Sequence, residues 1–200
     1  MPFKDNREYR AMPLLSLANE KRIDSEFYVE GYATTFDDPY VLHESEGIKY
    51  FEKIDRNALA GADVSDVIMQ YDHEGRVRAR TSNGTLGIEP NERGLFTYAD
   101  LSRSGAAKEL YEDIASGLIT KMSWAFTVAE DAYDRSAHTR VIKRIGKIYD
   151  VSAVSIPANI GTNISARSYF DGVIEAERRE SLARLELAKS KFYYFYGGNK

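Results

Sequence analysis

The stretch that decides the fold is Lys121-Met122-Ser123-Trp124-Ala125-Phe126-Thr127-Val128, where residue types alternate with a period of two. Large apolar side chains occupy one set of alternate positions, and small or polar side chains occupy the other. This period is typical of a β-strand that buries one face. The stretch therefore predicts a strand with a heavily apolar face, and it puts Ser123 on the face opposite Trp124.

A short helix is predicted immediately before this strand. Ala107, Leu110, Tyr111 and Ile114 are spaced at i, i+3, i+4 and i+7, which places them on one face of a helix. Gly117 stands where a helix of that length would end, and glycine is the usual residue there because it adopts positive φ without strain.

Further strands are predicted before this helix and after the strand at 121–128. The turn 90–94, Pro-Asn-Glu-Arg-Gly, connects two of them as a hairpin, and the last strand is expected to break near Gly146. Six or more strands with one inserted helix predict an α+β fold, mainly an antiparallel, closed or partly closed β-barrel with a few helices packed around it. The expected strands cover residues 27–36, 67–71, 85–88, 95–101, 121–128 and 139–156.

The two ends of the chain differ in composition from the strand-rich middle. Residues 1–25 are polar and mixed in sign, which predicts a loosely held N-terminal arm, and residues 26–165 form the expected barrel domain. Residues 166–200 predict a helix followed by an aromatic tail. The aromatic run 192–196 is interpreted as an anchor that docks on the barrel or on a partner, rather than as a segment that is recognised or removed.

The overall composition argues against several classes of protein. With 27 Lys and Arg against 31 Asp and Glu, the net charge of −4 offers no cationic field for nucleic acid. The mean hydropathy is −0.46, and no apolar stretch approaches the roughly 20 residues that span a bilayer, so no membrane partner is expected. The lack of cysteine excludes disulfides and indicates a reducing compartment.

Only three histidines are present: His43, His73 and His138. No H-E-x-x-H pair or cysteine gives metal-ligand spacing, and no glycine-rich phosphate loop or G-x-S-x-G elbow occurs, so neither a metal nor a cofactor is expected. A serine activated by an imidazole remains, because a hydroxyl needs a neighbouring base to become a nucleophile. Composition alone does not identify a catalytic pair: it favours His73 as a solvated loop histidine and Ser123 as a small residue on a half-buried strand.

Five blocks of sequence resemble, in the right order, the phage prohead protease family, which shares its fold with the herpesvirus assemblin proteases. Residues 30–37, E-G-Y-A-T-T-F-D, are similar to the opening G-Y-A-x-x-F-D strand, and residues 52–59 are similar to the segment that follows it. Residues 67–73, V-I-M-Q-Y-D-H, resemble the strand that delivers the catalytic histidine. Residues 113–126, D-I-A-S-G-L-I-T-K-M-S-W-A-F, resemble the block I-x-x-G-x-I-x-x-M-S-x-x-F, which is the most specific of the five. Residues 148–158, I-Y-D-V-S-A-V-S-I-P-A, resemble the ending E-V-S-x-V-x-x-P-A.

The resemblance implies a serine endopeptidase in which Ser123 is the nucleophile, His73 the general base and Asp150 the orienting residue. The family pattern has glutamate where this chain has the shorter Asp150, and the assemblins use a second histidine, so His138 is the alternative third residue. By analogy with the assemblins, the oxyanion donors are expected in the segment that runs through Asn159 and Gly161.

The implied substrates are segments of the scaffold and of the major capsid protein, cleaved during prohead maturation. The implied location is the host cytoplasm and then the interior of the prohead. Self-cleavage of the tails and a homodimer, as in the assemblins, stay open. The alternatives are an inactive structural or scaffold module with the same fold, and an esterase or amidase that acts on small acyl substrates.

Overall fold

The computed structural model describes residues 7–12, 15–16, 21–155 and 164–196. The described chain is α+β and consists mostly of strands, with two α-helices, so the expected class is confirmed. A seven-stranded sheet is formed by β1 (Arg7–Met12), β4 (Tyr40–Ser45), β5 (Ile48–Ile54), β6 (Ile68–Tyr71), β7 (Glu74–Arg80), β10 (Lys121–Asp134) and β11 (Thr139–Val154). A four-stranded sheet is formed by β2 (Leu15–Ser16), β3 (Tyr28–Thr35), β8 (Leu86–Pro90) and β9 (Gly94–Asp100).

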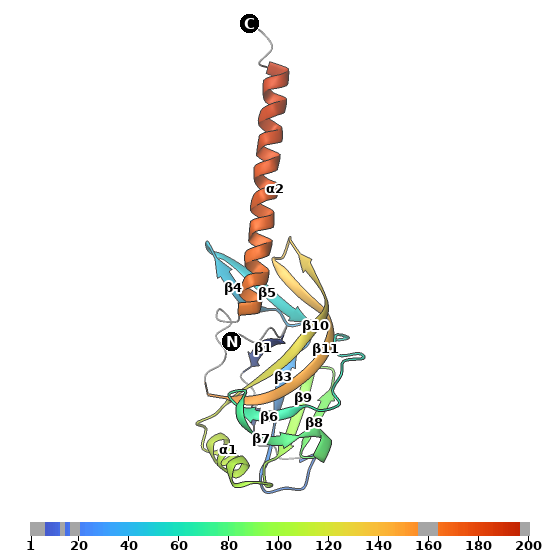
Figure 1. Ribbon diagram of the computed structural model, residues 1–200, viewed down its shortest axis with the longest axis vertical. Helices are drawn as coiled ribbons and strands as arrows, with labels where there is room; N and C mark the ends of the chain where they lie inside the picture. Colours follow the sequence, from blue (N-terminus) through green and yellow to red (C-terminus); the bar gives the residue numbers. More distant parts are fainter. Residues whose placement is uncertain (1–6, 13–14, 17–20, 156–163, 197–200) are drawn as a thin grey trace.

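The long β10–β11 hairpin is the centre of the larger sheet (Figure 1). Along the edge that does not face β10, β11 pairs with two different strands, both in parallel. Its residues Thr139–Ile142 pair with β5, and the segment from Asp150 to Ala153 pairs with β6. On the other side of the hairpin, β10 pairs antiparallel with β1. This branching brings the β6–β7 hairpin beside the last part of β11, next to the part of β10 that contains Ser123.

The closed or partly closed barrel expected from the sequence is not confirmed. Among the described strands neither sheet closes on itself, and the larger one runs from β1 at one edge to β4 at the other, with β6 and β7 as a side branch. Periodicity identifies strands, but the register between strands distant in sequence decides closure. The β10–β11 ladder contains several register shifts beyond Ala125, and these change the course of the outer half of the hairpin.

The main core lies between the two sheets. On β10, Met122, Trp124 and Phe126 are all 0% exposed, as the alternation predicts, and the Trp124 and Phe126 rings stack 4.1 Å apart. They pack in one cluster with Val29 of β3 and Leu95 of β9. The opposite face of the same strand is therefore left for Ser123.

The helix α1 (Gly105–Ala115) buries Ala107, Leu110 and Ile114 in this core. The Ser104 hydroxyl caps its first turn by accepting from the Ala107 amide, and Gly117 has the expected positive φ of 77° just after the end. The strand β11 is continuous, so the break expected near Gly146 is absent. The ladder does shift register there, because Thr127 pairs with Lys147 and Val128 with Ile145, which leaves Gly146 without a partner on β10.

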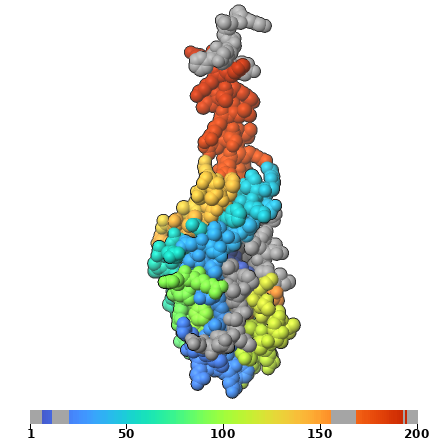
Figure 2. Space-filling model, turned by 180° about the vertical axis from the view of Figure 1, so that it is seen from behind, coloured from blue at the N-terminus to red at the C-terminus, as the bar shows by residue number. Residues whose placement is uncertain are grey.

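The helix α2 (Ile164–Tyr196) packs on the sheet at its base, and its distal part projects beyond the sheets (Figures 1 and 2). Its base is held by Phe170, which is 0% exposed in a second cluster with Leu42 and Tyr50. Farther along, the side chains of Phe192 and Tyr194 are exposed at the distal end, away from the sheets. Neither described helix combines the length and the apolar content that a membrane span needs.

The segment 1–25, expected to be a loosely held arm, contains β1 and β2, which pair with β10 and β3. The residues of β1 that face the interior are Glu8 and Arg10. Because both are charged, β1 does not show the alternation of apolar and polar residues that would predict a strand.

Candidate active site

Ser123 lies near the start of β10, on the face opposite the core. Its backbone pairs with Ser152 of β11 on one side and with Ala11 of β1 on the other. The residue is 0% exposed, so the hydroxyl is enclosed in the described conformation.

His73 lies in the two-residue turn of the β6–β7 hairpin, between the paired residues Tyr71 and Glu74. Asp72 and His73 have φ values of 50° and 60°, a left-handed conformation that is uncommon for residues other than glycine. A two-residue hairpin turn of type I′ requires positive φ at both positions, which is why Asn-Gly is its usual sequence. The sheet therefore holds His73 in a conformation that its sequence does not favour.

The Asp72 carboxylate fastens this turn to the end of β11. Its two oxygens accept hydrogen bonds from the Ser155 amide at 2.8 Å and from the Ser155 hydroxyl at 2.6 Å. The Asp72 amide in turn donates to the Ala153 carbonyl at 3.0 Å. These three bonds compensate for the strained turn and fix the direction in which His73 leaves the backbone.

The imidazole of His73 contacts both of the other residues expected from the sequence. Its Nε2 lies 2.7 Å from the Ser123 hydroxyl and its Nδ1 lies 2.6 Å from Oδ1 of Asp150. The side chains of His73 and Asp150 are 16% and 7% exposed. With a proton on Nδ1, the imidazole donates to Asp150, and Nε2 accepts from Ser123.

Asp150 is positioned by its strand pairing. It lies opposite Ala125 of β10 and beside Ile68 of β6, and its Oδ1 also accepts a bond from the Ser152 hydroxyl at 2.7 Å. The Ser152 oxygen accepts from the Gln70 amide at 3.3 Å, so it connects the carboxylate to the strand that leads to His73.

Ser152 and Asp72 belong to this arrangement, but sequence reasoning did not single them out. For Ser152 a signal was available, because it lies two residues after Asp150 on a predicted strand and therefore on the same face. For Asp72 the signal is weaker: a carboxylate directly before the histidine, in a hairpin without glycine at either turn position.

Hydroxyl, imidazole and carboxylate thus form a continuous hydrogen-bonded series. Such a series can move a proton from the hydroxyl to the imidazole while the carboxylate stabilises the resulting positive charge, which turns the hydroxyl into a nucleophile. The low exposure of all three groups strengthens these interactions, because little water competes for them.

The other expected residues lie elsewhere. His138 is near the far end of the β10–β11 hairpin, where its Nδ1 is 3.3 Å from the Tyr133 hydroxyl and its ring contacts Tyr50. Asn159 and Gly161, where oxyanion donors were expected, lie outside the described residues. In the part of the chain that the structure describes, no group of three or more acidic or histidine side chains could hold a metal ion.

Comparison with known proteins gives two matches. The model of a family described as caudovirus prohead serine protease matches residues 16–173, a range that includes His73, Ser123 and Asp150 but not β1. The prohead protease of Enterobacteria phage HK97 is 29% identical over 150 residues, which cover 72% of this chain and 61% of that protein. The chain thus spans less than two thirds of this relative's length. No solved structure matches.

Proposed function

The chain belongs to the caudovirus prohead serine protease family, and on that premise we propose that it is a serine endopeptidase with Ser123 as its nucleophile. His73 is the general base and Asp150 the residue that orients it. The observation that carries this proposal is the pair of contacts made by the His73 imidazole, at 2.7 Å to Ser123 and 2.6 Å to Asp150.

The proposed reaction proceeds through an acyl-enzyme. The Ser123 Oγ attacks the scissile carbonyl carbon while its proton passes to Nε2 of His73, and the tetrahedral intermediate collapses as that proton moves to the leaving amine. A water molecule then attacks the ester while Nε2 accepts its proton, and Nε2 returns that proton to Ser123 Oγ as the ester C–O bond breaks and the new carboxyl terminus leaves. Asp150 stays ionised throughout and stabilises the imidazolium.

The proposed substrates are scaffold segments and segments of the major capsid protein, cleaved while the prohead matures. Membership of a prohead serine protease family, and the similarity to the prohead protease of HK97, support this proposal. The proposed location is accordingly the host cytoplasm and then the interior of the prohead. Trimming of the chain's own tails is a further consequence to test, since both tails extend beyond the matched range.

The test is mass spectrometry of the purified chain, alone and mixed with its capsid protein. Ser123→Ala is expected to lower cleavage by at least about 10³-fold without changing the unfolding transition. Ser116→Ala, which removes an exposed serine near the end of α1, is the matched control and is expected to cleave normally. Normal cleavage by Ser123→Ala would refute the proposal.

A second candidate is an inactive structural or scaffold module of the same capsid assembly. The complete burial of Ser123 favours it, because a peptide bond cannot reach an enclosed hydroxyl until a covering group moves. Labelling with a fluorophosphonate separates the candidates: a protease that opens transiently becomes labelled at Ser123, whereas a folded module does not. A panel of peptide and small ester substrates separates the endopeptidase from an esterase or amidase.

A further inference from the structure

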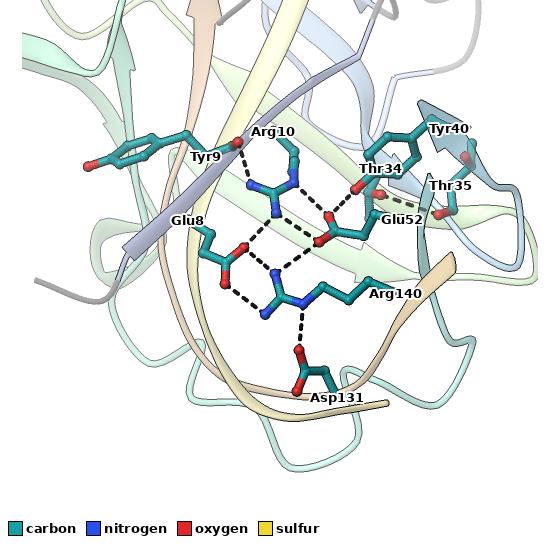
Figure 3. Close-up of polar contacts among 9 residues, drawn as sticks. All are labelled: Glu8, Tyr9, Arg10, Thr34, Thr35, Tyr40, Glu52, Asp131 and Arg140. Carbon is teal, nitrogen blue, oxygen red and sulfur yellow. Dashed lines mark hydrogen bonds and ion pairs between the residues drawn. The ribbon is translucent and has the colours of Figure 1, made fainter. Parts of the chain in front are cut away.

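The two faces of β1 have different surroundings. The interior face carries Glu8 and Arg10, which are 7% and 3% exposed. The other face carries Tyr9 and Ala11, which lie opposite Ala125 and Ser123 of β10. Figure 3 shows the Tyr9 ring pointing away from the charged side chains of its neighbours.

The interior face is anchored by a cluster of buried charges (Figure 3). The Arg10 guanidinium donates from Nε and Nη2 to the two carboxylate oxygens of Glu52 on β5, at 2.6 and 2.8 Å, and also to Glu8. Arg140 of β11 donates to Glu8 at 2.8 and 3.0 Å, and to Glu52 at 3.2 Å. Strand β1 is therefore attached to two other strands of the sheet by charge-assisted hydrogen bonds.

The electrostatics of this cluster oppose separation of the strand. Burial by itself lowers the pKa of Arg10, but Glu52, Tyr40 and Glu8 together outweigh burial and raise that pKa well above its ordinary value, so Arg10 stays charged. Withdrawing β1 would remove Arg10 from Glu52, and Glu8 from Arg140. The loss of a partner inside a protein is strongly unfavourable.

On the other face, the Tyr9 ring meets the imidazole of His73. The two ring centroids are 4.8 Å apart and the planes are inclined at 76°, an edge-to-face contact. The imidazole bridges Asp150, which lies opposite Ala125, and Ser123, which precedes Ala125 by two residues. Ala125 pairs with Tyr9 on one side and with Asp150 on the other, so Tyr9 and Asp150 lie on the same face of the sheet, and both contact the imidazole.

We propose that Tyr9 is a positioning residue for His73, and that β1 is a fixed wall of the active site rather than a strand that leaves when substrate binds. This rests on the proposed function. The imidazole is attached to a two-residue turn and is held at its two nitrogens, and the Tyr9 ring restricts its remaining movement. The charge cluster on the interior face keeps that ring in place.

The first test replaces the tyrosine side chain. Tyr9→Ala is expected to lower kcat between about 10- and 100-fold with little change in KM, because small misplacements of a catalytic group have effects of this size. Tyr9→Phe keeps the ring and is expected to lose far less. Tyr9→Leu keeps an apolar side chain of similar size but has no ring, and it replaces the alanine variant if that variant folds poorly. It is likewise expected to lower kcat. Tyr32→Ala, at a half-buried tyrosine of the other sheet, is the control and is expected to change kcat less than twofold.

The readout that separates positioning from mere stability is the NMR signal of the His73 imidazole. In Tyr9→Ala the ring resonances are expected to broaden or average, whereas Tyr9→Phe keeps them sharp. An unchanged kcat together with unchanged His73 resonances in Tyr9→Ala would overturn the inference. Because these resonances can be recorded in the Ser123→Ala background, they judge the inference even if the chain proves to cleave nothing.

The second test locks the strand. The chain has no cysteine, so Arg7→Cys with Thr127→Cys, a directly opposed pair of β1 and β10, introduces a single disulfide. Opposed residues of an antiparallel pair have Cα atoms about 4.5–5.5 Å apart, within the range that a disulfide bridges. The oxidised form is expected to cleave within about twofold of the reduced form, because β1 stays in place. If cleavage is lost on oxidation and restored on reduction, β1 must leave during the reaction. That result would refute the inference and leave the proposed function intact.

Discussion

The Ser152 hydroxyl donates a hydrogen bond to the same oxygen of Asp150 that faces His73. The two contacts measure 2.7 and 2.6 Å, and both Ser152 and Asp150 are buried. A carboxylate held in this way cannot rotate freely about its last bond, so the direction in which it meets the imidazole is set by the strand that carries both residues.

Ser152→Ala is therefore expected to impair catalysis without removing any of the three proposed catalytic groups. A hydrogen bond to a charged group is worth about 1.5–3 kcal/mol, which corresponds to a fall in kcat/KM of about 10- to 100-fold. Steady-state kinetics on a cleaved peptide measure this. Ser136→Ala, in the exposed turn between β10 and β11, is the control, and equal rates for both variants would show that Ser152 does not orient Asp150.

Asp72→Ala is expected to loosen the turn that presents His73. It removes two hydrogen bonds to Ser155, so the free energy of unfolding should fall by about 1–2 kcal/mol, and kcat by about 10-fold because the imidazole is less well placed. Asp72→Asn should lose less, because asparagine keeps an acceptor and tolerates positive φ. Urea unfolding and kinetics on the same samples separate the two effects.

The β4–β5 hairpin offers a matched control for this turn. Glu46 and Gly47 also form a two-residue turn in which both residues have positive φ, and the Glu46 carboxylate forms an exposed ion pair with Arg178 of α2. Glu46→Ala is expected to leave kcat unchanged and to alter stability by less than about 0.5 kcal/mol. If Asp72→Ala behaved in the same way, the bonds to Ser155 would have no role in presenting His73.

Glu52→Gln is expected to make stability less sensitive to acid. Burial by itself raises the pKa of Glu52, but the charge and hydrogen bonds of Arg10, together with Arg140 and Tyr40, lower it below its ordinary value of 4.5. A carboxyl group whose pKa is lower in the folded state adds stability above its unfolded pKa, and that stability is lost as the pH falls through the folded value. Wild type should therefore lose more stability than Glu52→Gln between neutral pH and pH values below 4.5.

At neutral pH, Glu52→Gln is expected to reduce the free energy of unfolding by about 3–5 kcal/mol, as removal of one partner from a buried ion pair usually does. Guanidinium unfolding at a series of pH values gives both quantities. Glu44→Gln removes an exposed carboxylate of β4 and controls for net charge. Parallel curves for wild type and Glu52→Gln would mean that Glu52 does not contribute to the pH dependence.

Much of the local structure was predictable because it depends on neighbours along the chain. The alternation of Met122, Trp124 and Phe126 predicted both the strand and its buried face, and the helical spacing of Ala107, Leu110 and Ile114 predicted α1. The turn chemistry of residues 90–94 predicted the β8–β9 hairpin. In each case the side chains that define the pattern lie within a few residues of one another.

The long-range polar contacts were not predictable in this way. Arg10 and Glu52 are 42 positions apart, and Glu8 and Arg140 are 132 apart, so no local pattern links them. Charged residues are also expected outside, and here four of them are buried because they neutralise one another. The same limitation explains why β1 read as a polar arm.

By itself the sequence determined several of the strands, the helix α1 and the apolar face of β10, and the ordered motifs indicated Ser123, His73 and Asp150 as candidate site residues. Only the tertiary structure decided that β11 pairs with both β5 and β6 and that the described strands do not close into a barrel. It also placed Tyr9 against His73, Ser152 against Asp150, and Asp72 against Ser155. The physical reason is range: periodicity and turn preference act over a few residues, whereas strand register and the pairing of buried charges are settled only when distant segments meet and exclude water.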